Sequence, residues 1–342
     1  MAAKIAILGT GLIGRSWSIV FARAGFEVWL WDPIDGAVST AIKLIKEGLP
    51  SLAEENLLNG CSVEQVFGRV HASDSLEDVL DGADHLQENA PERVEVKQEL
   101  YLQIDRLVGP QTVLASSTSG IVASLFTENL QSRERCLVAH PINPPHLVPL
   151  VELVPAPWTA ASVLEKTSEL MRQVNQAPIQ LNREIKGFVA NRLQGALLAE
   201  AFRLVEDGIC SARDIDTSIA EGLGLRWSFM GPFETIDLNS PTGIRGYCEN
   251  FGTLYYELAQ EQADPRVWGE ALLTKVEQER REELPAAKLL DRQHWRNQRL
   301  ALLVSAKKEA EEKLGKRLLN VWGALFLLIE MKSGFVGSRG QT

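Results

Sequence analysis

The stretch that decides the fold is residues 4–32, KIAILGTGLIGRSWSIVFARAGFEVWLWD. Its apolar run Ile5–Leu8 predicts a buried strand, which ends where the glycines begin. Apolar residues then recur at helical spacing up to Gly25, and the closing FEVWLWD predicts a second buried strand. A strand, a helix and a strand in this order are typical of a parallel sheet that is covered by helices.

Three glycines at the first turn, Gly9, Gly11 and Gly14, match the pattern GxGxxG. The alternative is a glycine-rich turn in an ordinary α/β protein, but the position between a predicted strand and a predicted helix favours a dinucleotide site. Gly9 permits the tight turn, Gly11 the close approach of a pyrophosphate, and Gly14 the close packing of helix on strand. The start of the helix then offers unpaired N–H donors to the phosphates.

Asp32 ends the second predicted strand, 18 residues beyond Gly14. A carboxylate there can accept hydrogen bonds from both ribose hydroxyls, and it would repel a 2′-phosphate. The sequence therefore predicts NAD as the cofactor rather than NADP, although Arg15 and Arg23 keep the exclusion of NADP from being absolute. The alternative is that Asp32 only caps a loop.

Further strands are expected at HLQEN (85–89), TVLASS (112–117) and RCLVAHP (135–141), each separated from the next by helix-like or polar segments. This alternation predicts an α/β fold that begins with a Rossmann-type, doubly wound parallel sheet. We assign residues 1–185 to this NAD-binding domain.

After APIQLNREIKG (177–187) the period of the apolar residues becomes helical and stays so to about residue 314. We therefore expect an all-helical C-terminal domain, residues 186–315, for substrate binding and dimerisation. Its apolar faces exceed what one helix layer can hide, which makes association through it plausible. Residues 316–342 form a tail of unknown role, in which the apolar run 321–329 is shorter than the ~20 residues that span a bilayer.

The 342 residues carry a net charge of −10, with acidic and basic residues intermixed. This pattern argues against nucleic acid and anionic membranes as partners. The first residues lead directly into a strand, so we expect no export signal. The cysteines are far apart and show no metal-binding or disulfide spacing, so we expect no metal site and a reduced, cytoplasmic setting. They are Cys61, Cys136, Cys210 and Cys248.

The segment 139–155, AHPINPPHLVPLVELVP, contains five prolines and therefore no regular helix. His140 is a titratable group in this rigid segment, and Glu152 follows 12 residues later, so a turn between them could fold the carboxylate back onto the ring. An imidazole suits proton removal from an alcohol near neutral pH, and a carboxylate behind it fixes its tautomer. The alternative is a buried histidine that only closes a strand.

Four motifs in one order, GTGLIG (9–14), SSTSG (116–120), AHPINPP…LVELVP (139–155) and GFVANRL (187–193), resemble the NAD-dependent 3-hydroxyacyl-CoA dehydrogenase family. GLIGRSW, VAHPINPP and GLGLRWSFMGPFET look most like its lambda-crystallin and L-gulonate 3-dehydrogenase branch, which also resembles L-carnitine dehydrogenases. The resemblance covers about residues 4–310.

The resemblance implies roles for four residues around the reacting hydroxyl. His140 would be the general base and Glu152 its carboxylate partner. Ser119 would hydrogen-bond the substrate oxygen, and Asn191 would hold substrate and histidine. The alternatives are that Ser119 starts the next helix and that Asn191 faces solvent on its helix.

The resemblance also implies cofactor contacts for Glu92 and Lys97, with Leu12, Ile13 and Asp32 as the remaining nucleotide contacts. The alternative for Glu92 and Lys97 is a solvated surface pair.

One departure concerns the substrate: the acyl-CoA enzymes usually carry asparagine at the position of Ser117, and they lack the Arg226 and Trp227 of this chain. A guanidinium matches a free carboxylate bidentately, so we expect Arg226 to bind the acid group of a small 3-hydroxy acid. Trp227 and Phe229 could close the pocket. The alternative is that Arg226 pairs with a structural acid such as Glu221 or Glu234.

The resemblance implies a homodimeric enzyme that oxidises a 3-hydroxyl group, with L-gulonate going to 3-dehydro-L-gulonate as its first nominee. L-carnitine, 3-hydroxypropionate, 3-hydroxybutyrate and a 3-hydroxyacyl-CoA are the alternatives. A crystallin-like structural protein is the alternative from another class.

Overall fold

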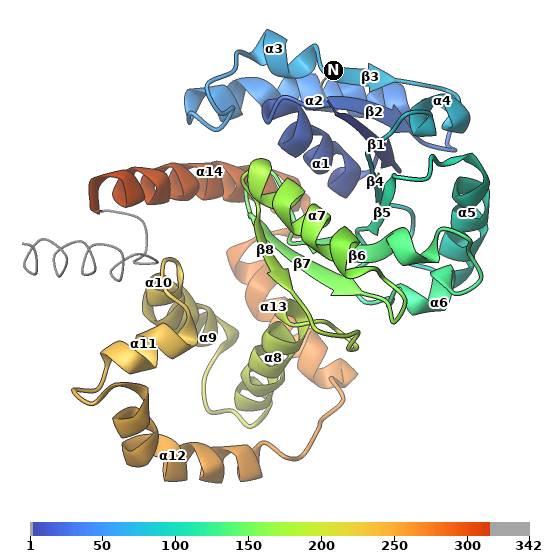
Figure 1. The fold of residues 1–342 in the computed structure, drawn as a ribbon. Coiled ribbons are helices and arrows are strands. Elements are labelled where there is room, and N and C mark those ends of the chain that lie inside the picture. Colours follow the sequence, from blue (N-terminus) through green and yellow to red (C-terminus); the bar gives the residue numbers. More distant parts are fainter. Residues whose placement is uncertain (1–2, 315–342) are drawn as a thin grey trace, which may run out of the picture.

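The computed structural model describes residues 3–314, which form a dinucleotide lobe and a helical lobe (Figure 1). The dinucleotide lobe is built on one eight-stranded sheet in the order β3-β2-β1-β4-β5-β6-β7-β8. The predicted tail 316–342 lies outside the described residues. The strands are β1 Lys4–Leu8, β2 Glu27–Trp31, β3 Val70–Ala72, β4 His85–Glu88, β5 Val113–Ser116, β6 Cys136–Pro141, β7 Leu150–Pro155 and β8 Ala177–Gln180.

Helices cover both faces of this sheet, because side chains alternate between the faces along each strand. Ile5 and Ile7 of β1 face one apolar core, with α1, α2, α3 and α7, whereas Ala6 and Leu8 face a second core, with α4, α5 and α6. The Rossmann-type prediction is thereby confirmed. The helices of this lobe are α1 Leu12–Arg23, α2 Ala37–Glu54, α3 Val63–Phe67, α4 Leu76–Leu80, α5 Val94–Leu107, α6 Ser124–Thr127, the short η1 Arg133–Arg135 and α7 Ala161–Gln173.

The sheet departs from the predicted parallel pattern at one place, where β6 pairs with β7 in antiparallel register. Only residues 142–149 connect these strands, and a parallel pair would need a crossover of a dozen residues or more. The hairpin places His140 directly opposite Glu152.

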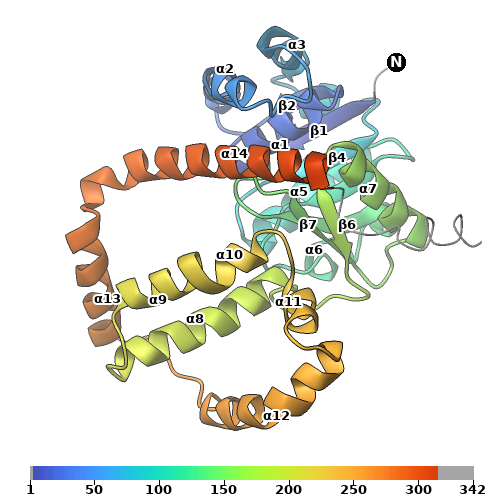
Figure 2. The same ribbon diagram turned by 90° about the vertical axis from the view of Figure 1, so that its left-hand side faces the viewer.

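The helical lobe follows β8, and the predicted boundary at 185/186 falls between Gln180 and Ala190. Figure 2 shows that α14, the last helix within the described residues, returns from this lobe to the dinucleotide lobe, where Ala301 packs into the core that contains α1 and α2. Within residues 3–314 no helix is both long and apolar enough to cross a membrane. The elements are α8 Ala190–Glu206, α9 Ala212–Thr217, the π-helical η2 Ser218–Leu223, α10 Gly224–Trp227, α11 Pro232–Leu238, α12 Gly243–Glu261, α13 Glu270–Glu283, the short η3 Ala286–Lys288 and α14 Leu289–Leu314.

Candidate active site

The glycine turn has the geometry of a dinucleotide site. Gly9 has φ of 84°, and a Cβ on it would lie 2.7 Å from the Asn89 carbonyl oxygen. A Cβ on Gly14 would lie 2.0 Å from the Gly9 carbonyl oxygen, so helix and strand approach closely. A Cβ on Gly11 would project into open space. Gly11 caps α1 without a side-chain hydrogen bond, and the first turn carries no acidic residue, so the N–H groups there suit a pyrophosphate.

Asp32 follows β2 beside this turn. Its Oδ2 accepts hydrogen bonds from the Thr10 backbone N–H at 2.7 Å and from the Thr10 hydroxyl at 3.0 Å, and its Oδ1 accepts one from Ile34 N–H. The carboxylate thus shapes the loop, and its remaining lone pairs can accept from ribose hydroxyls. Leu12 is half exposed at the start of α1, with Ile13 half-buried beside it.

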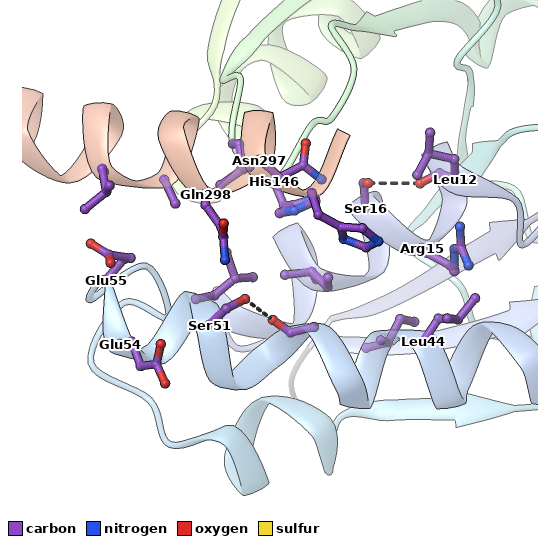
Figure 3. A pocket seen from close by; sticks show the side chains of 18 residues that line it. Leu12, Arg15, Ser16, Leu44, Ser51, Glu54, Glu55, His146, Asn297 and Gln298 are labelled. Atoms are coloured by element: carbon purple, nitrogen blue, oxygen red, sulfur yellow. Dashed lines mark hydrogen bonds between the residues drawn. The ribbon is translucent and has the colours of Figure 1, made fainter. Parts of the chain in front are cut away.

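Of the two arginines that left room for NADP, Arg23 is held by backbone carbonyls and Arg15 lines a cavity. Arg23 is 7% exposed and donates to the carbonyls of Leu57 and His146, so it cannot reach a 2′-phosphate. Burial lowers the pKa of Arg23 to about 10. Arg15 lines a cavity of about 560 Å³ between α1, α2 and α14 (Figure 3). The preference for NAD therefore depends on Asp32.

The imidazole and carboxylate predicted from residues 139–155 are in contact. His140 Nδ1 lies 2.7 Å from Glu152 Oε2, and their side chains are 6% and 0% exposed. Burial acts to raise the pKa of Glu152, but hydrogen bonds from His140, Ala190 and Val189 outweigh it and hold that pKa below its ordinary value. An ionised carboxylate only accepts, so Nδ1 carries the proton. Nε2 has no hydrogen-bond partner among residues 3–314, and in the neutral ring it can accept a proton.

The start of α8 holds the other oxygen of Glu152. Oε1 accepts from the backbone N–H groups of Val189 at 2.7 Å and Ala190 at 2.9 Å. The chain reaches this position through Gly187 and Phe188, whose φ values of 78° and 50° are left-handed. A left-handed φ is unusual for a bulky residue and costs about 1–3 kcal/mol. The buried Phe188 ring packs against His140 with 5.4 Å between centroids, which retains this conformation.

The same helix start reaches Ser119. Asn191 Nδ2 donates to the Ser119 carbonyl oxygen at 2.7 Å, and Glu92 Oε1 accepts from Ser119 N–H at 2.9 Å. The Ser119 main chain is therefore held from both sides, while its hydroxyl has no partner within the described part of the chain. Helix α6 begins only at Ser124, so Ser119 does not start a helix, and Asn191 does not merely face solvent.

Glu92 and Lys97 are not a surface pair. Glu92 Oε1 also accepts from the Thr118 hydroxyl and Gly120 N–H, and so it organises the loop after β5. Lys97 is 1% exposed and its Nζ lies 2.8 Å from Glu88 Oε1. A cofactor contact for either residue stays a prediction, and Lys97 would have to make it from this buried position.

A single chain does not bring Arg226 to the dyad. Arg226 is exposed on α10, which Figure 1 shows in the helical lobe, away from β6 and β7. Trp227 and Phe229 beside it are 40% and 58% exposed. Within residues 3–314, no group of three or more His, Cys, Asp or Glu side chains could hold a metal ion.

Sequence reasoning missed the buried polar groups behind these loops. Trp17 Nε1 and Gln87 Nε2 both donate to the Ser117 hydroxyl, at 3.0 and 2.7 Å. The sequence signal was the run of four hydroxyl residues at 116–119, which is unusual at the end of a buried strand.

A dinucleotide turn, an acid for the ribose and a carboxylate-braced imidazole on one sheet define an NAD-dependent dehydrogenase. The family model for the NAD-binding domain of 3-hydroxyacyl-CoA dehydrogenase matches residues 4–185, and the model for its C-terminal domain matches residues 187–282. The chain belongs to the 3-hydroxyacyl-CoA dehydrogenase family. It is therefore an NAD-dependent oxidoreductase that acts on a hydroxyl group.

Several known proteins are similar to this chain over most of its length. A lambda-crystallin homolog of Rattus norvegicus is 37% identical over 313 residues, 91% of this chain and 98% of the relative. An L-carnitine dehydrogenase of Pseudomonas aeruginosa is 34% identical over 91% of this chain and 95% of its own length. The solved structure of 5-formyl-3-hydroxy-2-methylpyridine 4-carboxylic acid 5-dehydrogenase, an NAD⁺-dependent dismutase, superposes with a TM-score of 0.77 at 26% identity, over 93% of this chain and 100% of that one.

Proposed function

We propose that this enzyme oxidises the 3-hydroxyl group of a small 3-hydroxy acid, with L-gulonate to 3-dehydro-L-gulonate as the reaction. The observation that carries the proposal is the convergence of His140, Glu152, Ser119 and Asn191 at the start of α8. The similarity to an L-carnitine dehydrogenase over 91% of the chain supports a small hydroxy acid over a long thioester.

The residues divide the work on the substrate hydroxyl. The Ser119 hydroxyl and the Asn191 amide orient the oxygen, and His140 Nε2 removes its proton. Glu152 stabilises the imidazolium that forms. The bound NAD would supply the acceptor for the hydride that leaves the same carbon. Gly11 and the start of α1 would hold its pyrophosphate, and Asp32 its ribose.

The acid group of the substrate needs a cation, and Arg226 is our candidate. We also propose a homodimer, in which the helical lobe of a second copy covers the exposed α8 and brings Arg226 to the dyad. Support comes from the large apolar side chains that the helical lobe leaves exposed, such as Leu193 at 64% and Phe233 at 74%. Light scattering on the purified chain tests this, and a monomer that is fully active would contradict it.

Four unpaired cysteines fit a reduced, cytoplasmic setting. A crystallin-like structural role would need only stability, and the dyad with its three hydrogen bonds is not required for that.

The test is NADH formation with L-gulonate, L-carnitine, 3-hydroxypropionate, 3-hydroxybutyrate and 3-hydroxybutyryl-CoA. We expect the largest kcat/KM for L-gulonate, and NADH formation about 10²–10⁴-fold slower in the His140→Gln control. A larger kcat/KM for L-carnitine would reassign the substrate, and no turnover of any compound would favour the structural role.

A further inference from the structure

The half-buried Ser117 hydroxyl is the centre of a polar network beside the proposed active site. It accepts hydrogen bonds from Trp17 Nε1 at 3.0 Å and from Gln87 Nε2 at 2.7 Å, and it donates to Asn89 Oδ1 at 2.8 Å. A hydroxyl has one donor and two acceptor positions, so Ser117 uses all three.

The direction of every bond in this network follows from its members. Trp17 Nε1 only donates, so the Ser117 proton must point to Asn89. The second N–H of Gln87 donates to the Ala139 carbonyl at 3.2 Å, and its Oε1 lies 3.1 Å from His85 Nε2. Burial lowers the pKa of His85 to about 4, so this ring is neutral and Nε2 carries its proton.

The network connects three strand ends that bear functional loops. Asn89 Nδ2 donates to the carbonyl of Leu8, which precedes Gly9, at 3.1 Å. Ala139 precedes His140, and Ser117 itself lies two residues before Ser119. One hydroxyl thus links the cofactor turn, the serine loop and the strand of the base.

We propose that Ser117 is a positioning residue, which holds Ser119 and His140 in register for the same substrate oxygen. The inference rests on the proposed function and deepens it. In this role Ser117 acts through its hydrogen bonds to Asn89 and Gln87 and through its own loop.

Loss of this hydroxyl leaves the donors of the buried Trp17 and Gln87 and the acceptor of the half-buried Asn89 without this partner. Such groups find new partners only if the loop or strand moves, because unpaired buried polar groups are strongly disfavoured. A displacement of 1 Å in a catalytic group lowers a rate by about 10²-fold. We therefore expect the effect of Ser117→Ala to fall on kcat.

The experiment compares Ser117→Ala, Ser117→Thr and Ser168→Ala by steady-state kinetics and by crystal structures. Ser168 is a matched control, since its hydroxyl is buried in α7 with no hydrogen-bond partner. We expect kcat to fall about 10- to 100-fold in Ser117→Ala with KM for the hydroxy acid nearly unchanged. Ser117→Thr, which keeps the hydroxyl, should retain most of the rate, and Ser168→Ala all of it.

An unchanged kcat in Ser117→Ala, or equal losses in Ser117→Ala and Ser168→Ala, would overturn the positioning role. If the wild type turned over no substrate, the proposed function would be wrong. The crystal structures would then still test whether Ser117 positions the Ser119 loop. A shift of the Ser119 loop relative to His140 supports the positioning role, and superposable loops contradict it.

Discussion

The dinucleotide lobe and the helical lobe bury their own side chains to very different degrees. In the dinucleotide lobe even polar groups such as Glu88, Lys97 and Glu152 are fully buried and paired. In the helical lobe α8 buries only Val205 of its 17 residues, while Leu193 is 64% exposed and Phe233 on α11 is 74% exposed.

This contrast distinguishes site residues that one chain fixes in position from site residues that it leaves unfixed. The dyad is fixed by a strand pair and by the start of α8, so its geometry is complete within one chain. Arg226 lies on α10, an element with no buried residue, so packing within one chain does not fix its position relative to the dyad. Exposed apolar area on this scale marks an interaction surface.

The largest expected effect is in the dinucleotide lobe. His140→Gln removes the base but keeps a polar side chain beside Glu152, and kcat should fall about 10²–10⁴-fold with little change in NADH affinity. Stopped-flow NADH formation and NADH fluorescence titration measure the two quantities. An equal loss of cofactor affinity would mean that the ring only supports the fold.

The loss of folding stability at acid pH should also arise in the dinucleotide lobe. Burial, with Arg23 as a smaller cause, lowers the pKa of His146 to about 4, whereas the unfolded ring protonates near its ordinary 6.5. Between these two pKa values the unfolded ring binds a proton that the folded ring does not. The free energy of unfolding is therefore unaffected above pH 6.5 and falls as the pH drops towards 4, by at most about 3 kcal/mol. His85 acts in the same direction.

His146→Gln should flatten the fall in Tm between pH 6.5 and 4. The matched control is His294→Gln in α14, an exposed histidine that lines the same cavity. Identical pH profiles of Tm in the two variants would show that burial of His146 is not the cause.

A more moderate effect is expected from the helical lobe. Arg226→Met removes a charge-assisted pair worth about 1.5–3 kcal/mol, so KM for the hydroxy acid should rise about 10- to 100-fold while KM for NAD holds. Arg226→Lys keeps the charge without the planar fork and should recover part of the loss. An unchanged KM in Arg226→Met would show that Arg226 does not bind the substrate.

The smallest expected effect concerns cofactor choice. Asp32→Asn replaces one acceptor oxygen and the negative charge, so KM for NAD should rise about tenfold and the discrimination against NADP should weaken. The ratio of kcat/KM for the two cofactors measures this. A ratio equal to that of wild type would mean that a residue other than Asp32 determines the preference for NAD.

The residues that could be predicted from the sequence are those whose role depends on local spacing. Gly9, Gly11 and Gly14 lie within one turn, and His140 meets Glu152 because a short proline-containing loop forces a hairpin. These local features settled the fold class and the dyad.

What could not be predicted depends on contacts between distant strands. Ser117 is bonded to Trp17, which is 100 residues away, and no spacing rule reports such a contact. For Lys97 the sequence offered a cofactor contact or a surface pair with Glu92, and the buried ion pair with Glu88 was not foreseen. The position of Arg226 relative to the dyad is beyond one sequence because it involves the arrangement of whole lobes.

The central claim is that His140 Nε2 faces the substrate hydroxyl beside the nicotinamide. A crystal structure with NAD and the best substrate of the panel tests it most directly. The account predicts the hydroxyl oxygen within about 3 Å of Nε2, with the Ser119 hydroxyl on the same oxygen. A nicotinamide that lies remote from this ring would contradict it.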